Sequence, residues 1–181
     1  MPRLLVPLFV SLLAAAPLAD QAKPPAKTPA PADPVLVLET AKGNIEIRFF
    51  RSEAPKSVEH ILELVKRSFY RGQRFHRVTE SLAQLGDPLS RNMSRQDSWG
   101  TGNSGNPIGV FEHSKKRTHV RGAVGLAHGG SPLGADSQFY IMKRASPSLD
   151  GKHAIIGQVI AGMAVVDKIV VPDMIKNTIL K

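Results

Sequence analysis

The feature that most constrains the fold is a succession of short apolar runs that are each ended by glycine or proline. The runs at 35–39 and 44–50 flank Thr40-Ala41-Lys42-Gly43, a turn sequence, and so predict a β-hairpin. Further strands are predicted at 75–79, 107–111, 119–127, 137–142, 153–160 and 177–180. A total of about seven or eight short strands is typical of an antiparallel barrel or a two-sheet sandwich.

Two segments have helical periodicity instead. The segment 52–67 should begin at Ser52 as the capping residue, with Pro55 in the first turn. Its apolar side chains recur every three or four positions, at Val58, Ile61, Leu62 and Val65. A shorter helix is predicted at 162–169. Two amphipathic helices fit the open ends of a closed antiparallel barrel better than they fit a sandwich, so we expect a mainly β barrel capped by two helices.

The N-terminus is predicted to be an export signal, residues 1–19. Arg3 is followed by an uncharged apolar run that is too short for a standard transmembrane helix, and small residues end the segment. Cleavage is expected after Ala19, and retention as a short membrane anchor is the alternative. Residues 20–34 contain five prolines, which predicts a semi-stiff, disordered linker. The folded domain is therefore expected at 35–181, in the periplasm or outside the cell.

Composition argues against several kinds of site. The chain has no cysteine, which excludes disulfides and thiolate metal sites. Its formal net charge is +9, but the basic residues are scattered and the densest run is only 115–117. Aromatic residues make up 6% of the chain, too few to suggest stacking platforms for nucleic acid. The six histidines lack metal-binding spacing, and His60 is predicted to be a helix-surface residue. We expect no metal and no other cofactor.

One stretch, residues 75–88, combines chemically unlike side chains. Arg77 stands beside apolar residues, Gln84 follows seven positions later, and the turn sequence Gly86-Asp87-Pro88 comes next. An arginine is costly to bury without partners, so Arg77 is either a solvated surface charge or a placed hydrogen-bond donor. The polar, glycine-rich segment 89–106 is predicted to be a loop that Trp99, the single tryptophan, pins to the body.

Six segments, in order, resemble the cyclophilin family of peptidyl-prolyl cis–trans isomerases. They are Phe75-His76-Arg77-Val78, Gln84-Leu85-Gly86-Asp87-Pro88, Trp99-Gly100-Thr101-Gly102, and the stretches 121–127, 137–141 and 149–153. The resemblance implies a closed eight-stranded antiparallel barrel with two capping helices. It also implies isomerisation of X–Pro bonds in unfolded or partly folded polypeptides during the folding of exported proteins. The protein is expected to act as a monomer.

The resemblance implies a role for each matching position. Arg77 matches the catalytic arginine. The positions expected to bind substrate are His76, Leu82, Ala83, Gln84, Ala127, His128, Gly129, Gln138, Tyr140, Leu149 and His153. Among these, Gln84 would bond the substrate backbone, 127–129 would pair with the peptide, and Leu149 and His153 would form the far rim of a proline pocket.

The sequence departs from the family pattern in this same region. Leu82 and Ala83 stand where the family has phenylalanine and methionine, and the run from Arg77 to Gln84 is one residue short. Ser148 replaces the rim tryptophan. These changes predict a wider, shallower pocket, a lower kcat/KM on short peptides than a typical cyclophilin has, and weak binding of cyclosporin. The alternative function is a module that binds proline-containing peptides with weak or no turnover.

Overall fold

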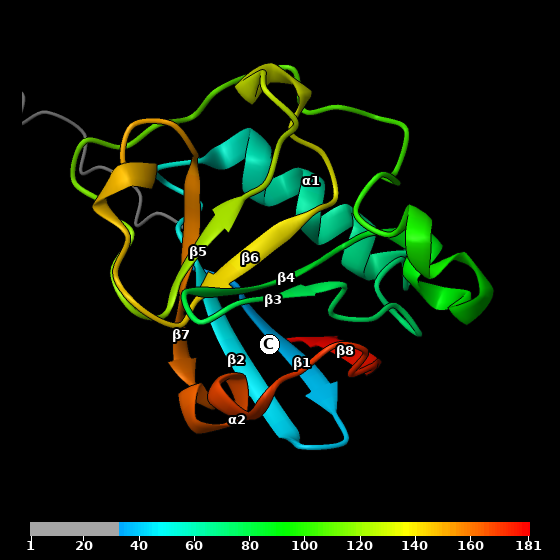
Figure 1. The fold of residues 1–181 in the computed structure, drawn as a ribbon. Coiled ribbons are helices and arrows are strands. Elements are labelled where there is room, and N and C mark those ends of the chain that lie inside the picture. The colour runs from blue at the N-terminus through cyan, green and yellow to red at the C-terminus, as the bar shows by residue number, and fades with distance from the viewer. Residues whose placement is uncertain (1–32) are drawn as a thin grey trace, which may run out of the picture. The chain divides into compact units, whose positions relative to one another are not determined.

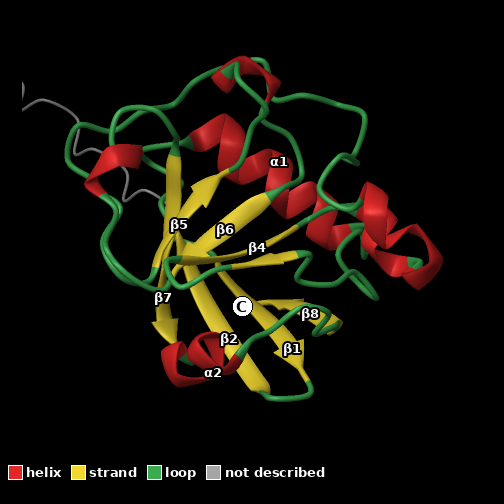
Figure 2. Cartoon of the chain, viewed as in Figure 1, coloured by secondary structure: helices red, strands yellow, loops and turns green. Residues whose placement is uncertain are grey.

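The computed structural model describes residues 33–181. The export signal predicted at 1–19 and nearly all of the predicted linker lie outside the described residues. The described part is one antiparallel sheet that curls into a half-barrel (Figures 1 and 2). Its strands are β1 (Val35–Thr40), β2 (Gly43–Phe49), β3 (Arg77–Val78), β4 (Leu82–Leu85), β5 (Ala123–Leu126), β6 (Phe139–Met142), β7 (Ile155–Ala161) and β8 (Ile175–Leu180). The order across the sheet is β3-β4-β6-β5-β7-β2-β1-β8.

The prediction of a closed barrel is wrong, because the two edge strands, β3 and β8, do not pair. The seam is bridged instead by the irregular segment that precedes β3. Ile175 donates to the carbonyl of Gln73 over 2.8 Å and accepts from the amide of Gly72 over 2.8 Å. Arg74 and Met174 add one isolated bridge. Since β3 has only two residues, it is too short to extend the ladder across this seam.

Two other strand predictions need correction. Residues 107–111 belong to no strand, although Ile108 donates its amide to the carbonyl of Ala135. The strand predicted at 119–127 begins only at Ala123, because Gly122 has a φ of 82° and the amide of Ala123 bonds back to Val120 in a turn. The hairpin of β1 and β2 is confirmed, with Thr40 opposite Gly43 at its turn.

Both helices are present, α1 (Pro55–Lys66) and α2 (Met163–Lys168). They lie toward opposite ends of the curled sheet (Figure 1). The apolar stripe predicted for the first helix is buried, and Val166 of α2 joins the same core. The strands contribute Leu36, Leu38, Ile45, Ile47 and Phe49 to that core. Burying one such side chain stabilises the fold by about 1.5–3 kcal/mol.

The start of α1 is capped from a distance rather than by Ser52. The N-cap residue is Ala54, whose side chain cannot accept a hydrogen bond. The carboxylate of Glu112 accepts from the amide of Lys56 over 3.1 Å and from the amide of Ser57 over 2.8 Å. These amides are among the donors that a helix leaves free at its N-terminus, where negative charge is favourable. The loop that carries Glu112 is thereby joined to α1.

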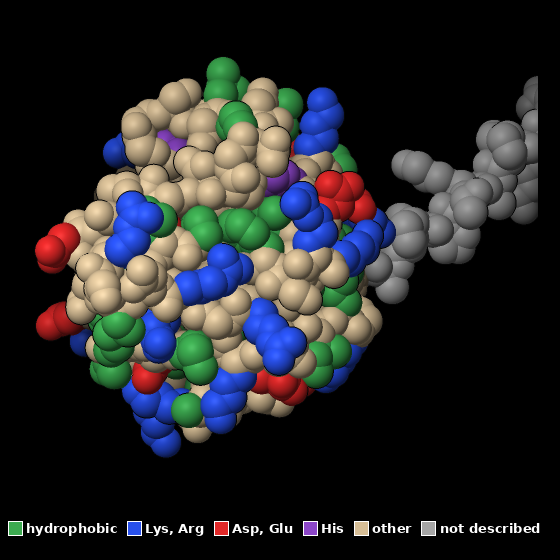
Figure 3. Space-filling view, turned by 90° about the vertical axis from the view of Figure 1, so that its right-hand side faces the viewer, with side chains coloured by type: hydrophobic (Ala, Val, Ile, Leu, Met, Phe, Trp, Pro, Cys, Tyr) green, Lys and Arg blue, Asp and Glu red, His purple; other side chains and the backbone are tan. Residues whose placement is uncertain are grey.

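Basic side chains are spread over the surface. Figure 3 shows Lys and Arg scattered over one face without a single dense patch, as the sequence predicts. Among residues 33–181, no helix combines the length and the apolar character needed to cross a membrane.

The role of Glu112 predicts a loss of stability. In Glu112→Ala the two amides at the start of α1 lose their acceptor, and the free energy of unfolding should fall by about 1 kcal/mol. Urea denaturation measures it. The matched control is Glu63→Ala, an exposed glutamate later in the same helix, which should change stability by less than about 0.5 kcal/mol. Equal stabilities of the two variants would contradict the capping role.

Candidate active site

The site is built on one row of residues that crosses four strands. Arg77 of β3 lies opposite Gln84 of β4, Gln84 lies opposite Tyr140 of β6, and Tyr140 lies opposite Gly125 of β5. Directly opposed residues in an antiparallel sheet project to the same face. The register therefore places the side chains of Arg77, Gln84 and Tyr140 together on the outer face of the sheet, away from the main core.

The same register removes Ala83 from the site. The neighbouring row consists of Val78, Ala83, Ile141 and Val124, and it faces inward. Ala83 is fully buried in the main core. The prediction that Ala83 binds substrate is therefore wrong, because successive residues of a strand point to opposite faces. Leu82 lies one position away and stays on the outer face, opposite Met142.

Leu82 belongs to a second, smaller apolar cluster that forms a floor beside the row. Its buried members are Phe50, Leu82, Ala123, Tyr140, Met142 and Ile155, with Ala127 and Leu149 packed against them. Four predicted binding residues from separate strands and loops thus meet in one cluster, namely Leu82, Ala127, Tyr140 and Leu149. The turn 79–81, closed by a 2.9 Å bond from the amide of Thr79 to the carbonyl of Leu82, makes the connection between β3 and β4 short.

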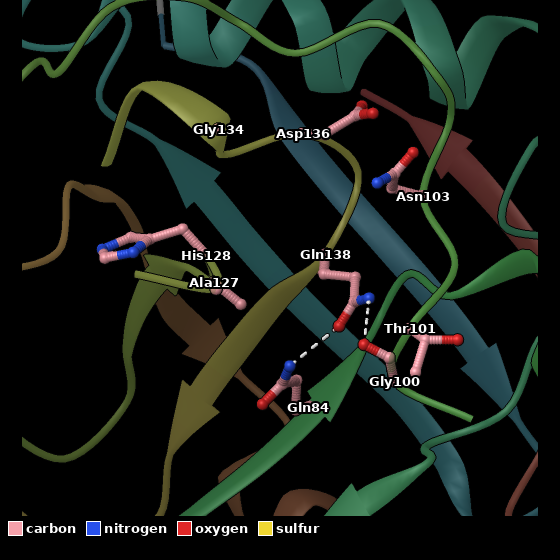
Figure 4. Close-up of a pocket in the computed structure, with 10 residues that line it drawn as sticks. Gln84, Gly100, Thr101, Asn103, Ala127, His128, Gly134, Asp136 and Gln138 are labelled. Atoms are coloured by element: carbon pink, nitrogen blue, oxygen red, sulfur yellow. Dashed lines mark hydrogen bonds between the residues drawn. The ribbon is translucent and has the colours of Figure 1, made fainter. Parts of the chain in front are cut away.

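A chain of hydrogen bonds leads from the loop at Gly100 to Arg77. Gln138 donates to the carbonyl of Gly100 over 3.0 Å and accepts from the Gln84 amide over 2.9 Å (Figure 4). Gln84 in turn accepts from Nη1 of Arg77 over 3.3 Å. The guanidinium is exposed. Its orientation is therefore set by two glutamines and not by burial.

A buried carboxylate fixes the loop at the start of this chain. Asp87 has no exposed surface, and it accepts from the amide of Leu89 over 2.7 Å and from the amide of Gly100. The preceding Gly86 has a φ of 103°, and a Cβ there would lie 2.2 Å from the Ser137 carbonyl oxygen. Only glycine permits this approach, which brings the Asp87 turn against the start of β6.

Trp99 acts differently from the prediction. Its indole donates to the carbonyls of Leu89 and Asn92, over 3.1 and 3.2 Å. Both acceptors belong to the same loop, so the tryptophan closes the loop on itself instead of pinning it to the body.

His76 is not among the residues that line the cavity described below. Its ring is largely buried, and neither ring nitrogen has a hydrogen-bond partner among the described residues. Burial lowers the pKa of its imidazole, which favours the neutral form.

A cavity of about 340 Å³ adjoins the row (Figure 4). Five predicted binding residues line it, namely Gln84, Ala127, His128, Gly129 and Gln138. Sequence reasoning missed the others, which are Gly100, Thr101, Asn103, Gly134 and Asp136. The segment 99–102 matched the family pattern but was given no binding role, and nothing in the sequence marked Asp136.

Asp136 connects this loop to α1. Its carboxylate accepts from the amides of Gly105 and Asn106, each over 3.1 Å, and lies 2.9 Å from Nε2 of His60. His60 is therefore a paired residue with 17% of its side chain exposed, and not a free helix-surface residue.

Two histidines form the side of the site opposite the cavity loop. The rings of His128 and His153 stack with centroids 4.2 Å apart, and the ring of Tyr140 meets His153 edge-on at 5.7 Å. His153 Nδ1 lies 3.0 Å from the carbonyl of Leu126, and His128 Nε2 lies 3.0 Å from the carbonyl of Lys152. Among residues 33–181, no three acidic or histidine side chains gather where they could hold a metal ion.

Comparisons with known proteins agree with this geometry. Residues 35–178 match the family model described as cyclophilin type peptidyl-prolyl cis-trans isomerase. A probable peptidyl-prolyl cis-trans isomerase of Brucella abortus is 38% identical over 149 residues, which cover 79% of this chain and 76% of the relative. A peptidyl-prolyl cis-trans isomerase of Helicobacter pylori is 34% identical over 145 residues, covering 78% of this chain and 83% of the relative.

Solved structures show the same fold. A cyclophilin-type isomerase of Cryptosporidium parvum, crystallised in the presence of the dipeptide Ala-Pro, superposes with a TM-score of 0.71 at 22% identity, covering 81% of this chain and 98% of that one. The cyclophilin AquaCyp293 of Hirschia baltica gives a TM-score of 0.64 at 20% identity, covering 80% and 73%. With its family model, its relatives and its fold in agreement, this chain belongs to the cyclophilin-type peptidyl-prolyl cis–trans isomerases.

Proposed function

We propose that this isomerase accelerates X–Pro isomerisation in exported polypeptides, with Arg77 as its catalytic residue. The observation that carries the assignment is the position of the Arg77 guanidinium, exposed but oriented by Gln84 and Gln138, beside the apolar cluster of Leu82, Tyr140 and Leu149. A fixed donor next to an apolar floor is the combination that this reaction requires.

The chemistry follows from the amide bond. Rotation costs about 18–20 kcal/mol because the C–N bond has double-bond character. In the twisted state the proline nitrogen becomes pyramidal, and its lone pair can accept a hydrogen bond. The guanidinium of Arg77 is always charged and presents several N–H donors, so it would stabilise the twisted amide more than the planar one. Bringing a reaction that takes about 10–100 s to milliseconds requires roughly 10⁴-fold, or about 5–6 kcal/mol.

The floor and the strand end would hold the substrate. The proline ring would lie on Leu82 and Tyr140, with Leu149 at the rim. The amide of Ala127 is already bonded to the carbonyl of Gln138 over 2.9 Å, which leaves the Ala127 carbonyl and the backbone of Gly129 for the peptide. The Cryptosporidium parvum neighbour crystallised in the presence of Ala-Pro supports a short proline-containing peptide as ligand.

The sequence of residues 1–34 supports the proposed location and the proposal that the clients are exported proteins. Their charged start, short apolar run and proline-rich continuation are typical of an exported protein with a spacer before its folded domain. The proposed site of action is therefore the periplasm or the cell exterior, and the proposed role is the folding of exported proteins.

A binding module with little turnover is the second candidate. Leu82 and Ser148 offer less apolar surface than phenylalanine and tryptophan would at those positions, so the proline ring would be held less firmly. NMR exchange spectroscopy on an X–Pro peptide distinguishes the two functions. Only turnover produces exchange between cis and trans peaks faster than the spontaneous rate.

Replacement of Arg77 tests the assignment. Arg77→Ala should lower kcat/KM in a proline-limited refolding assay by at least about 10²-fold, because it removes the donor aimed at the amide nitrogen. Arg77→Lys should also be impaired, since an ammonium lacks the planar fork of donors. The control is Arg48→Ala, an exposed arginine of β2, with activity near that of the unaltered protein. A folded Arg77→Ala variant with full activity would remove Arg77 from the mechanism.

Two partly buried histidines predict how stability depends on pH. Burial lowers the pKa of His76 and of His153. The unfolded chain therefore takes up protons first as pH falls through about 6.5, and the free energy of unfolding should decrease below that pH. Carboxylates whose pKa is lowered by hydrogen bonds, such as Asp150 bonded to His119, stay ionised through this range. Their protonation reduces stability only below about pH 4.

Substitution of His76 should flatten this dependence. Urea denaturation at pH 7.5 and pH 5 should show a smaller loss of stability for His76→Gln than for the unaltered protein. His113→Gln, at an exposed histidine, serves as the control and should leave the loss unchanged. An unaltered pH dependence in His76→Gln would show that burial does not perturb His76.

Export has a separate test. Residues 1–34 fused to a reporter that becomes active only outside the cytoplasm should yield activity, whereas residues 20–34 alone should not. Activity from neither fusion would overturn the proposed location without affecting the isomerase assignment.

A further inference from the structure

His119 is a buried side chain for which the proposed reaction has no use. No part of its side chain is exposed, yet both ring nitrogens have partners. Nδ1 lies 2.7 Å from a carboxylate oxygen of Asp150, and Nε2 lies 2.9 Å from the hydroxyl of Tyr140. A carboxylate, an imidazole and a phenol therefore form one hydrogen-bonded line that ends at the Tyr140 ring, which forms a wall beside the apolar floor.

The chemistry of the three groups sets the direction of these bonds. Burial, with a contribution from the negative charge of Asp150, raises the pKa of the Tyr140 phenol well above its usual range. The hydroxyl therefore keeps its proton and can donate a hydrogen bond to Nε2 of His119. In the neutral tautomer that carries its proton on Nδ1, the imidazole accepts that bond and donates to Asp150.

Gly125 gives the tyrosine ring its place. It lies opposite Tyr140 in the register, and a Cβ at this position would come within 2.5 Å of both Cζ and the hydroxyl oxygen of the tyrosine. The ring thus lies flat across β5 over a position that only glycine leaves open. The backbone of β5 lies against the ring and His119 bonds its hydroxyl, so the ring is fixed on two sides.

The backbone of His119 extends this connection to the rim. Its amide donates to the same oxygen of Asp150 over 2.7 Å, and its carbonyl accepts from the amide of Ser146 over 2.8 Å. Both ends of the segment 146–150 are therefore attached to one residue. Leu149, which packs against the apolar floor, lies within that segment.

We infer that His119 is a positioning residue, which joins the Tyr140 wall to the Leu149 rim so that both are fixed before a proline ring enters. The inference rests on the proposed function, because it takes Tyr140 and Leu149 as the two sides of the proline pocket. The shared chain of Asp150, His119 and Tyr140 makes wall and rim one unit. Its contribution is to substrate affinity, since none of the three groups donates to the amide nitrogen.

A double-mutant cycle on the full chain tests this coupling, with an Ala-Pro peptide as the probe. Asp150→Ala removes the hydrogen-bond partner of Nδ1, and Tyr140→Phe removes the partner of Nε2 while keeping the ring. Each should raise KM about tenfold and change kcat by less than about threefold, because a wall that must be ordered on binding weakens affinity. The double variant should have a KM no more than about threefold higher than that of Tyr140→Phe alone, because the single change has already broken the hydrogen-bonded chain.

Two further variants separate positioning from general stability. Asp150→Asn should keep KM within about threefold of the unaltered protein, because the oxygen that accepts both His119 bonds is retained as an amide oxygen. Asp97→Ala removes an exposed carboxylate from the loop segment 93–98 and should leave KM and kcat unchanged. Thermal unfolding of each variant verifies that it is folded.

The outcomes are distinguishable. One contrary outcome is that Asp150→Ala raises KM by the same factor in the Tyr140→Phe background as in the unaltered protein, and another is that it does not raise KM at all. In either case the Tyr140 wall and the Leu149 rim are not coupled through His119, and the inference is wrong. A peptide titration followed at the NMR signals of Tyr140 and Leu149 reports on the pocket itself. If isomerisation persists but those signals do not shift, the proposed pocket is wrong and the inference is wrong with it. Shifted signals with an additive cycle would overturn the inference alone.

Discussion

The cross-strand register of β3, β4, β6 and β5 is the constraint on which the site depends. It places Arg77, Gln84 and Tyr140 in one row on the outer face, and it turns Val78, Ala83 and Ile141 of the next row toward the main core. Because the side-chain period of a strand is two, a slip of one residue would exchange the two rows. Gln84 would then enter the core and Ala83 would face the groove. The main core thus specifies the site, since only one register buries its apolar residues.

The sequence could predict the elements whose pattern is local. The hairpin of β1 and β2 and the apolar stripe of α1 follow from periodicity, and both are present. Features that depend on distant partners could not be predicted. The cap of α1 comes from Glu112, more than fifty residues beyond the helix start, and no local pattern identifies it. The open seam depends on how the irregular segment 72–75 meets β8, which strand propensity does not describe.

The candidate site likewise contains residues that the sequence could predict and residues that it could not. Recurring motifs marked Arg77, Gln84 and Gln138, and the structure brings them into one hydrogen-bonded chain. The run before Gln84 is one residue shorter than in the family pattern, and the sequence does not show at which position the residue is missing. It was therefore ambiguous which face of the sheet Leu82 and Ala83 occupy. The turn at 79–81 resolves it, with Leu82 outward and Ala83 inward. Asp87 was recognised only as part of a turn and Asp136 was missed, because both bond backbone amides of a loop and this role requires the folded loop.

Both sides of the site end in a carboxylate, reached through hydrogen-bonded intermediaries. From Arg77 the chain passes through two glutamines and the Gly100 loop to buried Asp87, and from Tyr140 it passes through His119 to Asp150. An exposed guanidinium or an unsupported ring would have to lose its freedom when substrate binds, at a cost to affinity. That cost matters more here, because Leu82 and Ser148 supply less apolar contact than large aromatic residues would. A site with a smaller apolar floor therefore depends more strongly on a Tyr140 ring and an Arg77 guanidinium that are fixed before the substrate binds.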